Sequence, residues 1–458
     1  MTLLSRASAL ARLQTAIVAR ALRASHPALE IECVTRTSAG DQDQTTPLWK
    51  LPDKGAFTAD LSRALVDADA GIAVHSFKDL PTDMAAGTRR ILSSSPRRAW
   101  LLQDVVPALL PWPVSDVQAL PVRGNVETRL RKLVGGNEHG LVVAKAALDR
   151  LLGFGAPFES DAAAVRALLD QCLWMVLPMR EFPWAPAQAA LALEIARSRR
   201  DLDDVIAPVL CERTTDVVRQ ERQILDDHGG GCHQALGAAV LDRPYGRIVS
   251  IQARDRGLEL WALQGERHAF PRTTSDRIWP RHDEGVDAVR SSVRVPQPSA
   301  DAFRIARADA WPDHWSRDDR AVVWAAGTVT WRRLAARGMW VNGCADGLGD
   351  DEAPKVDVLA GRTLLWVSLT HDRSDRINAL ATCHVDARLP DDLPARSHFF
   401  WSSGDAFRRA VERWPSLRDG WHASGPGRTR QAILDAVGAA GRTGVWLDRQ
   451  SWQRDVCQ

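Results

Sequence analysis

One cysteine lies in a stretch that is nearly bare of side chains. In DDHGGGCHQALG, residues 226–237, three glycines run directly into Cys232. Glycine gives no steric cover and permits backbone angles that other residues avoid, so this thiol is predicted to be more accessible than a cysteine packed in a core. Nearby cations would favour its reactive thiolate form. The sequence therefore indicates either a reactive cysteine or a tight turn in which the cysteine is incidental.

A cation and a carboxylate are adjacent in HSFKDLP, where Lys78 precedes Asp79. An opposite charge lowers the pKa of a carboxylate and keeps it ionised. Such a carboxylate can stabilise a developing cation or relay protons. The alternative is an exposed ion pair, which contributes little. The chain has only six lysines, so a retained lysine suggests a position that needs a compact ammonium, although chance clustering explains the pattern equally well.

A basic helix is predicted in RGNVETRLRKL, which contains Arg123, Arg129, Arg131 and Lys132. Arginine grips carboxylates through two parallel hydrogen bonds, and a helix N-terminus favours anions. Nucleic acid is a weaker candidate ligand, because neither interleaved aromatic residues nor a basic stripe accompanies the segment. A solvated helix face is the simplest alternative.

Composition narrows the function classes. The 458 residues carry a formal net charge of +2, which gives no general attraction to nucleic acid or to a membrane surface. No apolar run is long enough to span a bilayer, and the N-terminus resembles the start of a fold more than a signal peptide. The seven cysteines include no CxxC pair, so neither zinc nor a disulfide framework is indicated. We expect a cytoplasmic monomer of about three domains with reduced thiols and no bound metal.

The residues with possible chemistry fall between alternating helices and strands. Hydrophobic periodicity predicts amphipathic helices at 9–24, 56–68 and 214–225, and a helical region at about 158–205 broken at 177–188. Apolar or alternating runs predict strands at 29–37, 70–76, 140–148, 246–254 and 258–266. This order predicts an α/β fold, in which ligand sites lie at the carboxyl ends of the strands.

These segments, in this order, resemble hydroxymethylbilane synthase, also called porphobilinogen deaminase. The resemblance covers roughly residues 1–290. It rests on SRASALARLQ, SHPALEIECVTRTSAGDQ, TPLWKLPDKGAFTADLSRAL, AGIAVHSFKDLPTD, RGNVETRLRKL and QERQIL followed by GGGCHQALG. No single segment is specific, but the combination is.

The resemblance implies a fold and a division into domains. The family has two periplasmic-binding-protein-like α/β lobes around a cleft and a small α+β domain that carries a cysteine. We therefore expect four units: lobe 1 at 1–92 and 187–208, lobe 2 at 93–186, the small domain at 209–292, and a further α/β domain at 305–458. In the family the loop cysteine binds a dipyrromethane cofactor through a thioether, which implies that role for Cys232.

The resemblance also implies the reaction and its residues. The family joins four porphobilinogen units head to tail and releases ammonia each time, in tetrapyrrole (heme) biosynthesis. Asp79 matches the carboxylate that stabilises the cation-like pyrrole left when ammonia departs. Cofactor-binding positions are matched by Cys232, Lys78, Ser8, Arg123 and Arg129. Substrate-binding positions are matched by Arg6, Lys54 and Gln188. Porphobilinogen is thus the expected small-molecule partner, and no nucleic acid or membrane partner is expected.

The chain departs from the family in three places. The family has TSSLRR before its RGN segment, whereas here SSSPRRAWLL resembles an earlier DPRDAF segment. Either the double arginine is lost, or Arg97 and Arg98 stand in for it. The family's LPAVGQGA becomes LPMREFPWAPAQAA, in which only Gln188 matches, and QVPI after the cysteine becomes HQAL. A non-catalytic member of the family that binds tetrapyrroles or other anions is therefore the alternative hypothesis.

Residues 305–458 are rich in tryptophan and weakly resemble uroporphyrinogen-III synthase, including a GPGRT turn. Each half is predicted to form a strand, a glycine turn and then a helix. That synthase usually has about 250 residues in two lobes. The region is therefore either a second enzyme fused to the first or a vestigial docking domain, and it contains no convincing catalytic cluster.

Overall fold

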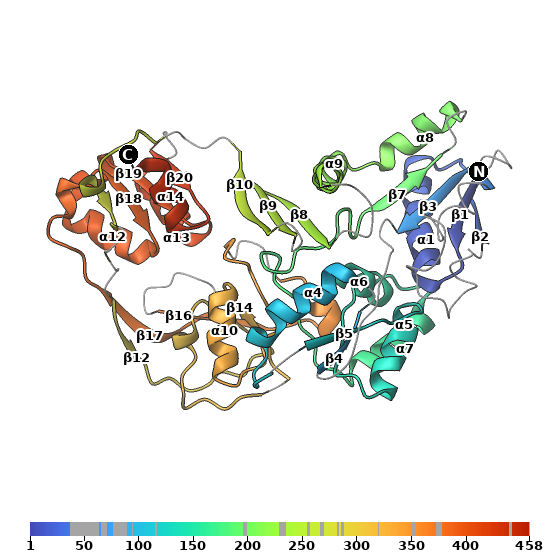
Figure 1. Cartoon of the computed structure of the whole chain (residues 1–458), viewed down its shortest axis with the longest axis horizontal. Helices are drawn as coiled ribbons and strands as arrows, with labels where there is room; N and C mark the ends of the chain where they lie inside the picture. The colour runs from blue at the N-terminus through green and yellow to red at the C-terminus, as the bar shows by residue number, and fades with distance from the viewer. Residues whose placement is uncertain are drawn as a thin grey trace.

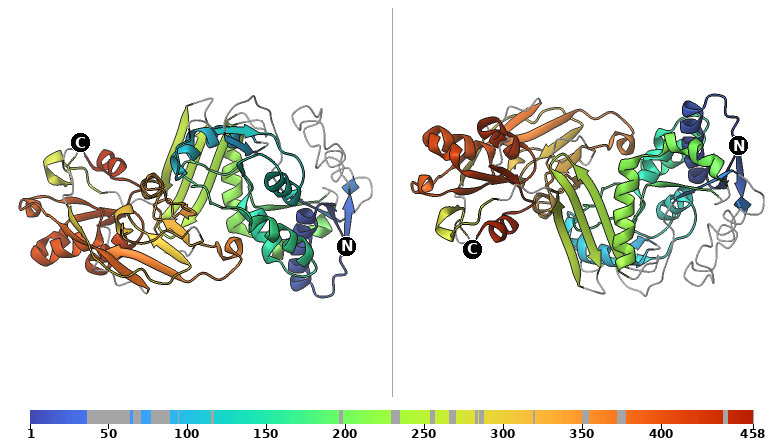
Figure 2. Two further views of the ribbon diagram at one scale, coloured as in Figure 1. Left: turned by 90° about the horizontal axis from the view of Figure 1, so that it is seen from below. Right: turned by 90° about the horizontal axis from the view of Figure 1, so that it is seen from above.

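The protein is a mixed α/β molecule with five separate sheets (Figure 1). The computed structural model describes residues 1–36, 64–65, 71–76, 89–93, 95–114, 117–195, 199–228, 235–253, 257–265, 270–281, 284, 288–318, 320–349, 354–371, 378–438 and 442–457. The molecule is elongated, with the chain termini at opposite ends (Figures 1 and 2). Among the described helices, none combines the length and the apolar character that crossing a bilayer requires.

The first sheet has the strand order β2-β1-β3-β7. Its strands are β1 (Thr2–Arg6), β2 (Glu32–Arg36), β3 (Ile72–Ser76) and β7 (Leu191–Glu194). The first three are parallel, and β7 runs antiparallel to β3. Helix α1 (Ala9–Ser25) covers the sheet with Val18, Ala19 and Leu22, whereas its Leu13 belongs to the hydrophobic cluster that contains Leu130 and Leu148.

The second sheet is parallel, with β4 between β5 and β6. Its strands are β4 (Arg89–Leu92), β5 (Val117–Leu120) and β6 (Gly140–Leu141). The helices are α4 (Pro96–Val105), α5 (Val126–Gly135), α6 (Lys145–Gly153) and α7 (Glu159–Leu169). Each strand leads directly into a helix, so the three connecting loops lie at the same edge of the sheet.

The third unit packs one helix on an antiparallel sheet of order β10-β9-β8. Its elements are α9 (Glu212–Asp227), β8 (Leu236–Arg243), β9 (Gly246–Ala253) and β10 (Leu258–Gln264). A short helix, α8 (Asp203–Ile206), precedes it. Both views of Figure 2 place this sheet between the N-terminal units and the C-terminal region.

The C-terminal region contains two sheets. The larger one has the order β12-β17-β16-β13-β14-β15. It is built from β12 (Ala288–Ser292), β13 (Ala302–Ile305), β14 (Val322–Ala325), β15 (Gly343–Cys344), β16 (Trp366–His371) and β17 (Ala379–Ala387), with α10 (Thr328–Ala336) and α11 (Asp357–Ala360).

The smaller C-terminal sheet is parallel, with the order β11-β18-β19-β20. It is built from β11 (Ile278–Trp279), β18 (His398–Trp401), β19 (Trp421–Ser424) and β20 (Thr443–Val445), with α12 (Gly404–Arg413), α13 (Arg428–Val437) and α14 (Arg449–Val456). Short 3-10 turns occur at Val106–Leu109, Arg200–Leu202, Ala207–Val209, Ser275–Arg277, Ala308–Ala310, Leu393–Ala395 and Pro415–Asp419.

Continuous hydrophobic packing joins the C-terminal region to the second sheet. One cluster combines Leu101 and Leu109, beside α4, with Phe303 and Trp331 of the larger C-terminal sheet unit. The Trp331 side chain is fully buried, and its indole Nε1 donates to the carbonyl of Leu109 at 3.0 Å. The C-terminal region is therefore packed against the second sheet unit and is not connected to it by a linker alone.

Two secondary-structure predictions are wrong. The helical region predicted at about 158–205 ends at Leu169, and residues 191–194 form strand β7. The strand predicted at 140–148 is confined to Gly140–Leu141, and α6 begins at Lys145. In both places tertiary pairing overrides local propensity. The helix predicted at 56–68 lies mostly outside the described residues.

Strand pairing bears on where the units begin and end. Strand β4, Arg89–Leu92, pairs with β5 and β6 of the second sheet. Strands β11 and β12, within 278–292, pair with β18 and β17 of the C-terminal region. The division into domains expected above stays a prediction, and these pairings are the contacts that any division has to accommodate.

Candidate functional site

Several candidate residues adjoin the carboxyl edge of the first sheet. Arg6 is the last residue of β1. Ser8 caps helix α1, where its Oγ accepts a hydrogen bond from the backbone N–H of Ala11 at 3.3 Å. This cap uses an oxygen lone pair, so the hydroxyl proton is still able to donate to an anion at the helix N-terminus.

Four candidates lie outside the described residues: Lys54, Lys78, Asp79 and Cys232. The structure does describe the elements that flank three of them. Strand β3 ends at Ser76, two residues before Lys78, and Ser76 pairs with Leu191 at the start of β7. Helix α9 ends at Asp227 and β8 begins at Leu236, on either side of the cysteine stretch.

The loop that follows β5 is locked by its own hydrogen bonds. Asn125 caps α5 by accepting from the Thr128 N–H at 2.8 Å. Arg129 Nε donates to the carbonyl of Gly124 at 2.7 Å. Gly124 has φ of 110°, and a Cβ there would come within 2.6 Å of Thr128 Cγ2, so the turn requires glycine. This turn fixes Arg123 and Arg129 beside the N-terminus of α5.

Arg98 brings Gln188 to the edge of the second sheet. It lies in the first turn of α4, which Ser95 caps. Its Nη1 donates to the carbonyl of Val142, just beyond β6, at 2.9 Å. Its Nη2 donates to Gln188 Oε1 at 3.5 Å. Since Gln188 shortly precedes β7 of the first sheet, this contact links the facing edges of the two sheets.

The Gln188 segment has a left-handed backbone on both sides of the glutamine. The φ angles are 61° at Ala187 and 76° at Ala189. This conformation costs about 1–2 kcal/mol for a residue with a Cβ, so contacts elsewhere have to maintain it. Arg150 Nη2 donates to the Ala189 carbonyl at 2.5 Å, and the Ala187 N–H donates to Glu221 Oε2 at 2.8 Å.

Glu221 is a functional candidate that the sequence reasoning missed. Besides the Ala187 N–H, its carboxylate accepts from Trp184 Nε1 at 2.7 Å and from the Val240 N–H at 3.0 Å. Its side chain is only 2% exposed, and burial raises its pKa while the three donors oppose that rise. A glutamate in the polar segment QERQIL is expected to be exposed. The one sequence signal that could have identified it is its position shortly before the cysteine loop.

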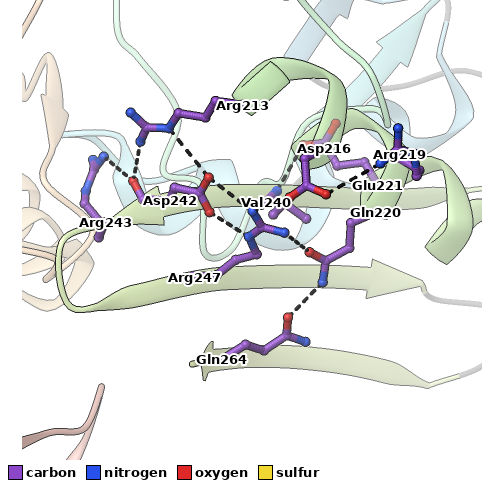
Figure 3. Close-up of polar contacts among 10 residues, drawn as sticks. All are labelled: Arg213, Asp216, Arg219, Gln220, Glu221, Val240, Asp242, Arg243, Arg247 and Gln264. Carbon is purple, nitrogen blue, oxygen red and sulfur yellow. Dashed lines mark hydrogen bonds and ion pairs between the residues drawn. The ribbon is translucent and has the colours of Figure 1, made fainter. Parts of the chain in front are cut away.

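An ion-pair network fixes α9 to the β8–β9 hairpin (Figure 3). Arg247 donates from Nε to Asp242 at 2.6 Å, from Nη2 to Asp216 at 2.6 Å, and from Nη1 to Gln220 at 3.0 Å. These hydrogen bonds raise the pKa of Arg247 above its ordinary value. Together with Glu221, they hold rigidly to each other the two elements that flank the Cys232 stretch.

Arg97 is a buried cation. It is 3% exposed, and its Nη1 donates to the carbonyl of Pro183 at 2.5 Å. Burial, reinforced by Arg98, lowers its pKa to about 9. Over the described part of the chain, no carboxylate forms an ion pair with it. Arg97 is therefore a desolvated cation beside Arg98 at the start of α4.

The arrangement can bind a carboxylate-rich ligand across the edges of two sheets. No group of three or more His, Cys, Asp or Glu side chains that could hold a metal occurs among the described residues. A pocket of about 310 Å³ lies elsewhere, between the β8–β9 turn and β19–β20, and none of the candidate residues lines it. The described candidate residues lie near the sheet edges and not in that pocket.

Comparisons with known proteins show what the chain is similar to. A family model described as "Porphobilinogen deaminase, dipyromethane cofactor binding domain" matches residues 1–91 and 85–204. A protein named porphobilinogen deaminase from Bordetella parapertussis is 34% identical over 290 residues, which cover 56% of this chain and 87% of the relative. Those from Burkholderia thailandensis (34% over 314 residues; 61% and 89%) and Clostridium novyi (29% over 258 residues; 51% and 81%) are also similar.

Proposed function

The chain belongs to the porphobilinogen deaminase family, and on that premise we propose that it polymerises four porphobilinogen units on a dipyrromethane primer bound to Cys232. The family's members are transferases of tetrapyrrole synthesis, and the matched domain is the one that binds the dipyrromethane cofactor. The assignment of individual residues to the reaction is part of the proposal.

The donor set fits a dipyrromethane. Each of its pyrroles carries acetate and propionate groups, so it needs several cations and hydroxyl or amide donors. We assign this binding to Ser8, Lys78, Arg123 and Arg129, with the thioether on Cys232. The locked turn after β5 and the cap at Ser8 support the assignment, because both hold these residues at helix N-termini next to the ends of strands. When bound, the primer supplies the terminal pyrrole onto which each unit is added.

The arginine pair at the start of α4 replaces the family's double arginine in this proposal. Arg97 and Arg98 follow a strand and begin a helix at the same edge as Arg123. This segment lies within the range 85–204 that the family model matches. The position at the sheet edge is what supports Arg97 and Arg98 as stand-ins.

The chain's own residues then perform three tasks. Arg6, Lys54 and Gln188 orient the incoming porphobilinogen through its carboxylates. Asp79, kept ionised by Lys78, stabilises the positive charge that develops when the C–N bond breaks and ammonia leaves. To the same carboxylate we assign the proton that the terminal pyrrole loses after the new C–C bond forms.

One contact carries the proposal, the Arg98–Gln188 hydrogen bond that joins the two sheet edges. The test is the intact mass of the purified protein beside its Cys232→Ser variant. A wild-type excess equal to two linked pyrroles, absent from the variant, is expected. Asp79→Ala should retain the fold and lose ammonia release by about 100-fold or more. A bare wild-type mass after incubation with porphobilinogen would instead favour the non-catalytic binder.

A second activity is proposed for the C-terminal region, that of a uroporphyrinogen-III synthase. The favouring observation is that residues 278–457 form two sheets. The smaller is parallel throughout, and the larger is parallel except for β12, which runs antiparallel to β17. Two lobes are what the resemblance leads one to expect. Separating the type III from the type I uroporphyrinogen isomer in the product decides the question, since an excess of type III requires the second activity.

A further inference from the structure

One short segment contacts three parts of the molecule: the larger C-terminal unit, α4 and α9. Residues 179–189, hereafter the strap, contain most of the departure from the family pattern LPAVGQGA. The strap runs from the C-terminal region, past α4 and α9, to the start of β7. Its contacts can be followed from one end to the other.

The first end of the strap is held by the C-terminal region. Thr328, the first residue of α10, donates from Oγ1 to Glu181 Oε1 at 2.7 Å, and Arg332 Nη2 lies 3.8 Å from the same oxygen. The backbone N–H of Arg180 donates to Asp346 Oδ1 at 3.4 Å. Thr328 is 7% exposed, so its hydrogen bond is well shielded from water.

The middle of the strap holds the buried arginine. Phe182 is part of the hydrophobic cluster that contains Trp331, and the guanidinium of Arg97 lies 5.8 Å from the Phe182 ring centre. The next residue, Pro183, accepts the hydrogen bond from Arg97. Pro183, whose carbonyl orients Arg97, is therefore only two residues beyond Glu181, which Thr328 anchors.

The far end of the strap is the Gln188 segment. Glu221 holds the Trp184 indole and the Ala187 N–H, and Arg98 contacts the glutamine side chain. The left-handed alanines on either side of Gln188 make this shape unfavourable for the segment alone. Anchors outside the segment have to maintain it, and those at Glu181 belong to the C-terminal region.

We infer that the C-terminal region is a positioning part of the polymerisation site, acting through the strap, with Glu181 and Thr328 as its positioning residues. The inference rests on the proposed function, in which Arg97 and Arg98 replace the family's double arginine and Gln188 orients the incoming porphobilinogen. It assigns a role to the C-terminal region whether or not that region has a reaction of its own.

Two threonines of α10 provide a matched test. Thr328→Val removes the hydroxyl that anchors the strap and keeps the side-chain shape. Thr330→Val removes an equivalent hydroxyl two residues along, which donates to the carbonyl of Ala306 at 3.2 Å and does not reach the strap. Both variants are compared with wild type as full-length protein at 25 °C, where each is folded.

Two readouts are taken. The first is hydrogen exchange of a peptide spanning 184–190, which reports the strap directly and needs no activity. Loss of one net hydrogen bond of about 1 kcal/mol corresponds to roughly five-fold faster exchange in Thr328→Val, with no change in Thr330→Val. The second is ammonia release from porphobilinogen, in which Thr328→Val should raise KM or lower kcat by a similar factor while Thr330→Val keeps wild-type values.

The outcomes separate the inference from the proposed function. Unchanged exchange in Thr328→Val, or equal changes in both variants, overturns the inference. A lower melting temperature with unchanged kcat and KM also overturns it, because it shows a merely structural contact. If wild type itself releases no ammonia, the proposed function fails, and the exchange comparison still decides whether the C-terminal region holds the strap.

Discussion

At the scale of single residues, the site is shaped as much by buried acids as by its cations. Glu221 and Asp346 both lie in the interior, and both accept from backbone N–H groups of the strap or its neighbours. Neither forms an ion pair with a cation among the described residues. Local motifs revealed the cations, because Arg123 and Arg129 have recognisable neighbours in sequence. The acids were hidden, because a lone Glu or Asp in a polar stretch looks solvated.

Asp346 gives the protein a pH-dependent stability. Burial raises its pKa to about 7 from 3.8, with the nearby Glu181 adding to the rise. Between those values the folded state binds a proton that the unfolded state lacks, so the free energy of unfolding falls as pH rises from about 4 to 7. The shift corresponds to at most about 4 kcal/mol.

Asp346→Asn should remove this dependence, because asparagine still accepts from Arg180 and tolerates the φ of 53° at this position. Urea denaturation at pH 5 and pH 8 is the measurement. Relative to wild type, the variant should gain roughly 2–4 kcal/mol on going from pH 5 to pH 8. A constant difference between the two proteins at both pH values would contradict the prediction.

At the scale of elements, the sequence predicted α1, α5, α9, β2, β3, β9 and β10 but misjudged β7. Leu191, Leu193 and Ile195 alternate with smaller or polar residues, as expected for a strand, but they lie among good helix formers. Pairing with β3 decides the outcome, and no local pattern reports a partner strand more than 100 residues away. The carboxyl-edge placement of Arg6 and Arg123 was predictable, because it follows from alternating strands and helices alone.

The turn into β7 should be stabilised by restoring a glycine. Ala189 is exposed and has φ of 76°, so Ala189→Gly relieves strain without removing packed atoms. We expect a gain of about 1 kcal/mol in the free energy of unfolding, measured by urea denaturation. Its neighbour Ala190 has an ordinary φ, and Ala190→Gly should instead lower stability by about 0.5–1 kcal/mol. A loss of stability in both variants would show that the left-handed turn is not strained.

At the scale of the whole molecule, the C-terminal region and the second sheet share their interior. The sequence showed a change of character near residue 300, but it could not show that the two parts have a common core. Three of the tryptophans that mark the region as unusual, Trp311, Trp315 and Trp331, belong to this core, and Trp331 is fully buried against the segment that follows α4. The division expected from composition thus says little about which parts fold independently.

A chain ending at residue 277 should therefore be unstable. It lacks Phe303 and Trp331, which cover Leu101 and Leu109 in the intact protein. Exposed apolar surface of this kind leads to aggregation or to rapid proteolysis. Limited proteolysis and size-exclusion chromatography, run beside the full chain, provide the measurement. A monomeric product as resistant as the full chain would show that the first three units are self-sufficient.

The pairing of β11 with β18 also imposes a delay on folding during translation. Ile278 pairs with His398, 120 positions later in the chain. At roughly 5–20 residues per second, translation delays that partner by on the order of ten seconds. The N-terminal units leave the ribosome first, and part of their interior stays uncovered until the C-terminal region has been made. The nascent chain is therefore expected to need chaperones during this interval. Synonymous codons that slow translation between these two strands would lengthen the delay and lower the yield of folded protein.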